Sequence, residues 1–158
     1  MIEIEVYLHN HFLKVIPNDP ERQTKILLFL RDKQSGSAFP IAFQEEIAAM
    51  VLNATSTRED LSLDGFTLIQ RIIEFSRGTV KLAKATIYEI KNDQFLARLH
   101  FLVDGEEKIE RVDTSVALGA ALRAGAPITV SEEVFIEAIQ MPDAERITSI
   151  IRSHENED

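Results

Sequence analysis

The fold is decided by residues 95–125, which read FLARLHFLVDGEEKIERVDTSVALGAALRAG. Residues 95–103 are mainly apolar, and the polar Asp104-Gly105 dipeptide favours a tight turn into a second strand. Asp113 then stands where a helix cap belongs, and residues 116–124 are an alanine-rich segment with helical character. This stretch therefore predicts a unit of strand, turn, strand and helix.

Residues 25–53 repeat the same order earlier in the chain. A short apolar run at 25–30 and a second run at 38–43 flank a polar turn, which predicts another hairpin. Gln44-Glu45-Glu46 follows with carboxylates suited to the first turn of a helix. Identity between the two stretches is slight, so internal duplication and convergence on a common unit both stay open.

The remaining segments complete one α+β domain. Residues 2–8 alternate apolar and polar side chains, which is typical of a half-buried outer or early strand. We expect two layers, with a mixed sheet of about six strands covered by helices on one face. The domain should span residues 1–152, followed by an acidic, disordered tail at 153–158. Further elements are expected as a helix at 66–75 capped by Asp64, a strand at 80–90, a strand at 126–130, and helices beginning near Ser131 and Pro142.

Composition limits the partners and the compartment. The 158 residues include no cysteine, which excludes disulfides, thiolate catalysis and zinc-finger ligation and fits a reducing compartment such as the cytoplasm. No run of eighteen apolar residues occurs, so we expect no membrane span. The formal net charge of −9 disfavours nucleic acid as a partner, although a local basic region can oppose that field.

Three segments resemble the bifunctional nuclease domain family, and the match that they define extends over most of the chain. The first is Phe39-Pro40-Ile41 running into Glu46-Ile47-Ala48-Ala49, which is similar to a Pro-Ile strand followed by a Glu-Ala helix start in the family. The second, residues 91–97, resembles the family's turn and its Thr-Phe-Tyr-Ala strand. The third is Val112-Asp113 with residues 121–130, which looks like the long closing motif and carries the clearest match. The resemblance implies a homodimeric nuclease that acts on DNA and RNA.

Two departures from the family pattern keep a second class of function open. Where family members typically carry Thr-His-Asp, this chain has Thr67-Leu68-Ile69, and it has Asp113-Thr114-Ser115-Val116 in place of a longer segment with an arginine and a second aspartate. Phosphodiester cleavage needs an activated water, a stabilised phosphate charge and usually a metal held by carboxylates. The alternative is a non-catalytic dimeric domain with a binding or regulatory role.

Glu46 and Asp113 are the candidate catalytic and metal-binding residues. Each stands at the start of a predicted helix, and a pair of such acids can hold Mg²⁺ or Mn²⁺ if the two units pack side by side. Thr67 and Ser115 are the candidate substrate-binding residues, from their places in the family motifs. The alternative is that both acids only cap their helices and complement the helix dipoles.

Histidines and lysines offer weaker candidates. His9 and His11 would share a face of a strand and can chelate a transition metal, but no third ligand is evident, which favours a surface strand end or turn. His100, within an apolar strand, is expected to be structural. The nearest approach to a basic strip is Lys81, Lys84 and Lys91 with Tyr88 nearby, and we interpret it as a solvated face.

Overall fold

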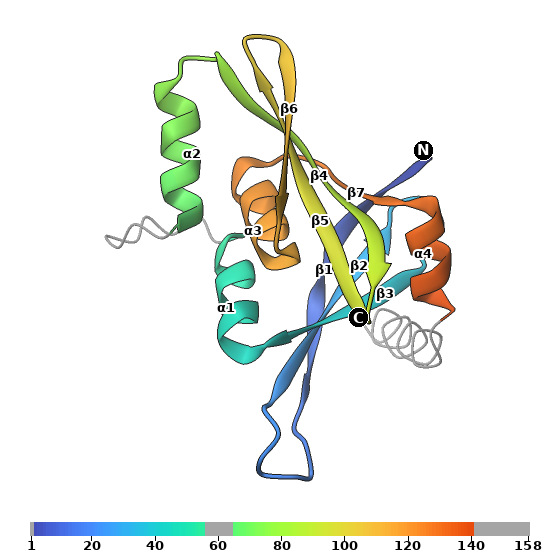
Figure 1. Cartoon of the computed structure of the whole chain (residues 1–158). Helices are drawn as coiled ribbons and strands as arrows, with labels where there is room; N and C mark the ends of the chain where they lie inside the picture. Colours follow the sequence, from blue (N-terminus) through green and yellow to red (C-terminus); the bar gives the residue numbers. More distant parts are fainter. Residues whose placement is uncertain (1, 56–64, 141–158) are drawn as a thin grey trace.

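The computed structural model of the chain describes residues 2–55 and 65–140 (Figure 1). Within these residues, hairpins alternate with helices in the order that the sequence predicts. The elements are β1 (Glu3–Val15), β2 (Lys25–Asp32), β3 (Ala38–Gln44), α1 (Glu45–Asn53), α2 (Gly65–Phe75), β4 (Val80–Lys91), β5 (Gln94–Val103), β6 (Glu106–Val112), α3 (Thr114–Ala124), β7 (Ile128–Ser131) and α4 (Glu132–Ile139).

All the described strands form one mixed sheet in the order β3-β2-β1-β7-β4-β5-β6. Neighbouring strands run antiparallel except β4 and β7, which are parallel. The predicted α+β class with a mixed sheet is confirmed, with seven strands where about six were expected. The outer position suggested for residues 2–8 is wrong, because β1 pairs with β2 on one side and β7 on the other.

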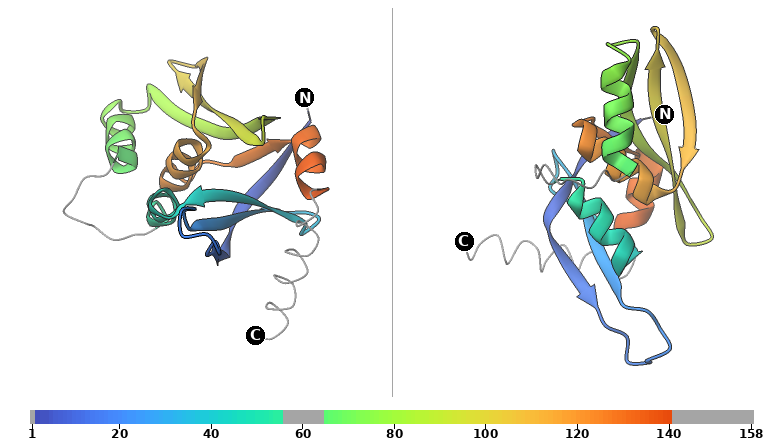
Figure 2. Two further views of the ribbon diagram at one scale, coloured as in Figure 1. Left: turned by 60° about the horizontal axis from the view of Figure 1, so that its bottom comes forward. Right: turned by 90° about the vertical axis from the view of Figure 1, so that its left-hand side faces the viewer.

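The two predicted units occupy opposite ends of the sheet. The β2–β3 hairpin supplies one edge strand and leads into α1, and the β5–β6 hairpin supplies the other edge and leads into α3. Both helices lie between the two halves of the curved sheet, while α4 lies at the other end of the strands (Figure 2). The strand-turn-strand-helix order is therefore confirmed for both units.

The core fills the inner, concave face of the sheet. Its buried side chains come from the strands and from all four described helices, which confirms that the helices cover one face. Phe39 of β3 stacks on Phe95 of β5 at 5.5 Å between ring centroids and meets Phe135 of α4 edge-on at 5.7 Å. Such aromatic pairs contribute about 0.5–1.5 kcal/mol each beyond area burial. These contacts join the two halves of the sheet across its inner face.

The outer face carries polar and charged side chains over β4, β5 and β6, because successive residues of a strand point to opposite faces. Ile87 and Ala97 belong to the core, whereas their neighbours Thr86 and Arg98 face outward. On the β1–β2 half, the outer face instead holds a small apolar cluster around Phe29.

Small residues let α3 lie close to its neighbours. Ala117, Ala120 and Ala121 are buried, and the ring of Phe66 in α2 lies against Gly119. The helix ends at Gly125, whose φ of 68° is the left-handed conformation that glycine adopts without strain. Gly119 therefore lets α2 and α3 approach each other closely.

Several expectations fall outside the described residues. These are the cap at Asp64, the last helix from Pro142, the domain boundary at residue 152 and the acidic tail at 153–158. Among the helices that the structure describes, none combines the length and the apolar character needed to span a membrane.

Candidate functional site

Glu46 is the second residue of α1, directly after the edge strand β3. Its side chain is exposed and borders a surface pocket of about 480 Å³ that Gln23, Thr24 and Gln44 also line. The adjacent Glu45 forms an ion pair with Lys14 at 3.2 Å, whereas Glu46 has no ion-pair or hydrogen-bond partner among the described residues. The Glu46 carboxylate is therefore available to a ligand.

Asp113 is the N-cap residue of α3, directly after the other edge strand, β6. Its backbone carbonyl accepts the first helical hydrogen bond from Ala117, but its side chain accepts none from the first turn. The hydroxyl of Thr114 instead anchors this corner by donating to the carbonyl of Phe95 at 2.8 Å. Asp113 thus holds the cap position while its carboxylate stays exposed.

The two acids occupy matching places in the two units, at the starts of helices that pack against each other on the inner face. They follow the two opposite edge strands, and Asp113 does not border the pocket beside Glu46. Within residues 2–55 and 65–140, no three His, Asp or Glu side chains are close enough to form a complete metal site. Mg²⁺ is commonly bound by one or two carboxylates plus water and substrate phosphates, so the oxygen donors suit such an ion.

The two candidate substrate-binding hydroxyls are also near the first described residues of their helices. Ser115 is the second residue of α3, two positions after Asp113, and is half-buried. Thr67 is the third residue of α2 and is also half-buried, beside Phe66, which packs against α3. Backbone amides at such helix starts are good partners for phosphate oxygens.

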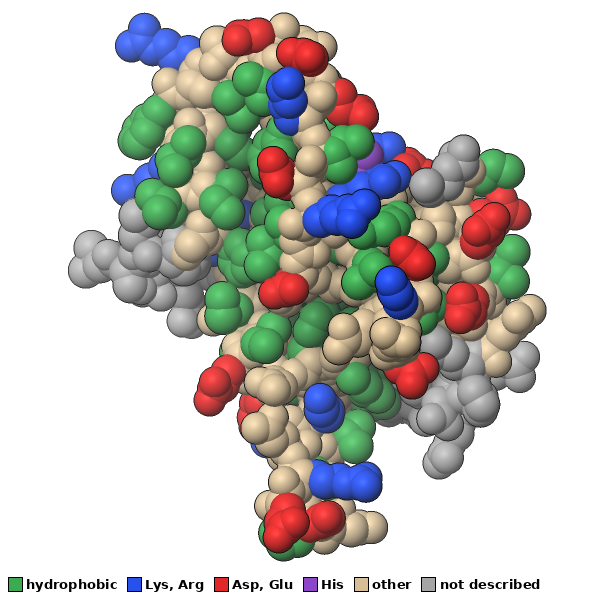
Figure 3. Space-filling view, in the orientation of Figure 1, with side chains coloured by type: hydrophobic (Ala, Val, Ile, Leu, Met, Phe, Trp, Pro, Cys, Tyr) green, Lys and Arg blue, Asp and Glu red, His purple; other side chains and the backbone are tan. Residues whose placement is uncertain are grey.

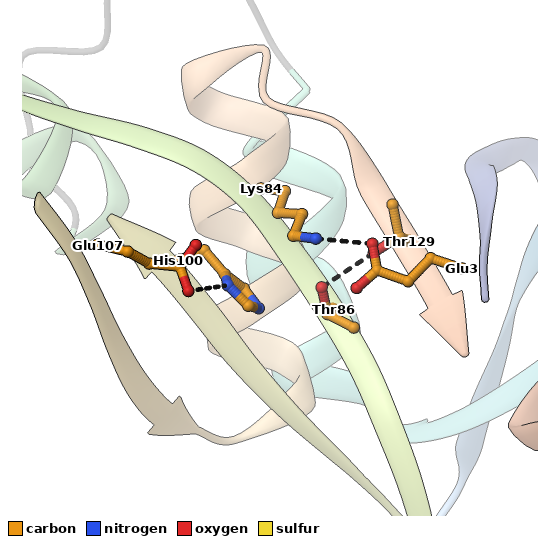
Figure 4. Close-up of polar contacts among 6 residues, drawn as sticks. All are labelled: Glu3, Lys84, Thr86, His100, Glu107 and Thr129. Carbon is orange, nitrogen blue, oxygen red and sulfur yellow. Dashed lines mark hydrogen bonds and ion pairs between the residues drawn. The ribbon is translucent and has the colours of Figure 1, made fainter. Parts of the chain in front are cut away.

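A second group of polar residues lies on the outer face, around β4 and the strands β7 and β5 on its two sides (Figure 4). The hydroxyls of Thr86 and Thr129 share a 2.9 Å hydrogen bond across the parallel β4–β7 pair, and Thr86 is fully buried. Lys84 forms an ion pair with Glu3 at 2.6 Å. This lysine was expected on a solvated face, but it is half-buried and holds β4 to the start of β1.

His100 lies beside this group and is only 5% exposed. Its Nδ1 is 3.9 Å from Oε1 of Glu107, and neither ring nitrogen has a hydrogen-bond partner among the described residues. Burial lowers the pKa of His100 below its usual value, and the positive charges of Lys84 and Arg98 lower it further. The ring is therefore neutral at pH 7, in line with its expected burial in the strand.

His9 and His11 lie together, with ring centroids 5.2 Å apart. His9 is buried within the long strand β1, next to the register shift between Leu8 and Phe12, so the expected strand end or turn is wrong for this residue. Among the residues that the structure describes, no third ligand joins the pair.

Two arginines on the outer face were missed by the sequence analysis. Arg98 of β5 and Arg111 of β6 are directly opposite each other, and the guanidinium of Arg98 lies 4.9 Å from the ring centroid of Tyr88. The Asp104-Gly105 turn could have indicated this pairing, because counting outward from a two-residue turn places position 98 opposite position 111.

Comparison with known proteins identifies one family. The sequence description of the bifunctional nuclease domain matches residues 28–143. The matched range runs from β2 past the end of α4 and includes all three segments that carried the resemblance. No curated protein matches the chain.

Proposed function

The chain belongs to the bifunctional nuclease domain family, and on this basis we propose that it is a metal-dependent nuclease acting on DNA or RNA. The observation that supports this proposal most is the state of Glu46 and Asp113. Both are exposed acids at helix starts, and neither side chain has an ion-pair or hydrogen-bond partner among the described residues. Acids that served only to complete their helices would more often be used in capping.

In this proposal Glu46 and Asp113 hold Mg²⁺ or Mn²⁺ through their carboxylate oxygens. A bound divalent ion lowers the pKa of a coordinated water and neutralises charge on a phosphate. The carboxylates supply hard oxygen ligands, and their exposure leaves room for water and a phosphate oxygen beside them.

Thr67 and Ser115 are proposed to bind the substrate. A hydroxyl in the first turn of a helix can donate to a phosphate oxygen together with the free backbone amides there. Ser115 stands two residues from Asp113, so one end of α3 would both hold the ion and orient the phosphate.

The second candidate function is a non-catalytic dimeric domain with a binding or regulatory role. One face of α2 favours it: Leu68, Ile72 and Phe75 are 46%, 56% and 76% exposed at helical spacing. We refer to these three side chains as the α2 stripe. Apolar side chains clustered on an outer helix often mark a protein interface, and we propose that a second copy of the chain packs on it. In either role the absence of cysteine fits the cytoplasm.

Binding of Mn²⁺ tests the metal site directly. Electron paramagnetic resonance of free Mn²⁺ should show uptake by the wild type and loss of uptake by Glu46→Gln and by Asp113→Asn. The matched controls are Glu45→Gln on the same helix and Asp104→Asn in the β5–β6 turn, and both should bind as the wild type does. Equal uptake by all five proteins would reject the proposed ligands.

A further inference from the structure

The outer face of β5 and β6 carries two arginines at directly opposite backbone positions, Arg98 and Arg111. Arg98 and Arg111 are partners in the antiparallel register, and like charges at such positions destabilise a sheet. Neither arginine forms an ion pair with any residue that the structure describes. Two arginines on one sheet face make it positively charged, and bound anions would neutralise that charge.

Two of the acids on this face already have cationic partners. Glu3 pairs with Lys84 at 2.6 Å, and Glu5 pairs with Lys33 at 2.7 Å. Glu107 lies 3.9 Å from the neutral ring of His100, and its single negative charge offsets only one of the two arginines. The protein as a whole carries a net charge of −9, yet this part of its surface keeps uncompensated positive charge. Figure 3 shows Lys and Arg side chains gathered beside a histidine over β4 and β5.

Buried polar atoms lie beside the two arginines. Nε of Arg98 and both ring nitrogens of His100 are buried and have no hydrogen-bond partner among the described residues. Buried polar groups in folded proteins usually pair with protein, ordered water or a ligand, so these atoms can accept a further partner. Tyr88 holds the Arg98 guanidinium over its ring, so Arg98 is positioned before any ligand arrives.

We propose that Arg98 and Arg111 bind backbone phosphates of single-stranded nucleic acid on the outer face of β4, β5 and β6. The guanidinium group presents paired donors that match phosphate oxygens, and an open sheet face can accept an extended strand. This inference rests on the proposed nuclease function, which makes nucleic acid the expected anion. Arg98 and Arg111 belong to β5 and β6 rather than to the helix starts at Glu46 and Asp113, and in this inference they hold the substrate without taking part in cleavage.

Binding is measured by fluorescence anisotropy of a labelled single-stranded oligonucleotide, as DNA and as RNA, in excess chelator so that no cleavage occurs. The double variant Arg98→Gln, Arg111→Gln should bind at least tenfold more weakly than the wild type. Its slope of log affinity against log salt concentration should fall by about 1.4, as expected for the loss of two phosphate contacts on a single strand. Because Arg111 is exposed, Arg111→Gln alone provides a variant whose fold is unchanged, and it should also weaken binding.

The control variant Arg71→Gln, Lys108→Gln removes the same charge from exposed positions elsewhere, since Arg71 is on α2 and Lys108 points to the opposite face of β6. It should bind as the wild type does. The inference would be overturned if the Arg98 and Arg111 variants bound as tightly as the wild type, or if the control variant lost as much affinity as they do. It would also be overturned if the wild type did not bind at all. Preferred binding of duplex, or a change in oligomeric state on replacing Arg98 and Arg111, would also overturn it.

The same assay separates this inference from the proposed catalytic role. The double variant Glu46→Gln, Asp113→Asn should bind the oligonucleotide normally in chelator. Normal binding combined with no cleavage by the wild type in any metal would leave the binding surface intact and reject the nuclease. If the wild type cleaves normally and replacing the arginines leaves binding unchanged, the nuclease stands and the binding surface is rejected.

Discussion

The ring of Phe66 in α2 occupies the space in which a side chain at position 119 of α3 would lie, and the ring fits there because residue 119 is a glycine. Phe66 is the only buried residue in the described part of α2, so its contact with α3 is the main one that holds this helix. It joins the helix that bears Thr67 to the helix that begins after Asp113.

Replacing Gly119 with alanine should destabilise the protein, because the new Cβ would overlap carbons of the Phe66 ring. Overpacking of this kind typically costs about 1–3 kcal/mol. Urea unfolding measures the loss, and adding Phe66→Leu should recover part of it. Gly65→Ala is the control, since no atom of the described residues lies within 4 Å of a Cβ there. A Gly119→Ala protein as stable as the Gly65→Ala protein would contradict the observed packing.

The Thr86–Thr129 hydrogen bond predicts a non-additive pair of substitutions. Thr86→Val alone leaves the largely buried hydroxyl of Thr129 without this partner, and such a loss costs about 1–3 kcal/mol. Replacing both threonines with valine removes the unpaired hydroxyl, so the double variant should be more stable than Thr86→Val. Thermal unfolding of four proteins tests this: the wild type, Thr86→Val, Thr129→Val and the double variant. Simple addition of the two single effects would show that the hydroxyls do not interact.

His100 should make stability depend on pH in a defined direction. Burial and the charges of Lys84 and Arg98 lower its pKa in the folded state, so the unfolded chain binds a proton first as pH falls. The contribution of neutral His100 to the unfolding free energy is complete above the unfolded pKa of about 6.5, and it is lost as the pH falls below that value. As the pH falls from 7.5 to 5.0, the unfolding free energy of the wild type should decrease relative to that of His100→Gln. A constant difference would contradict the lowered pKa.

The α2 stripe predicts a self-association that apolar contacts drive. Replacing Ile72 and Phe75 with glutamine should convert a dimer to a monomer in size-exclusion chromatography with light scattering. Both side chains are exposed, so unfolding by urea should change little. The control is Ile136→Gln, because Ile136 is an exposed apolar residue on α4. If the wild type is monomeric, or the stripe variant stays dimeric, the interface lies elsewhere or is absent.

The local units of this fold could be predicted from the sequence because their signals are short in range. Asp104-Gly105 defines a hairpin, and both residues adopt the positive φ angles that a tight turn requires. Glu46 and Asp113 were correctly placed at helix starts for the same reason. The neighbours of strands outside the hairpins were not predictable in this way.

The order of the sheet depends on β7, a strand of four buried residues that pairs with β1 and β4. Those pairings join segments far apart in the chain, and no local pattern in residues 128–131 indicates their partners. The insertion of β7 puts the two units at opposite ends of the sheet, with Glu46 and Asp113 after its two edge strands. The outward network of Lys84, Thr86 and Glu3 likewise exists only once β7 has brought β1 near β4.

The rate of metal-dependent cleavage tests the central claim most directly. Wild-type protein, Glu46→Gln, Asp113→Asn and the control Glu45→Gln are incubated with quenched fluorescent DNA and RNA single strands in Mg²⁺, in Mn²⁺ and in chelator. We predict cleavage by the wild type and by Glu45→Gln in at least one metal, none in chelator, and a rate at least a hundredfold lower for the other two variants. Equal rates for all four proteins, or no cleavage by the wild type under any condition, would contradict the assignment of this domain as a nuclease that uses Glu46 and Asp113.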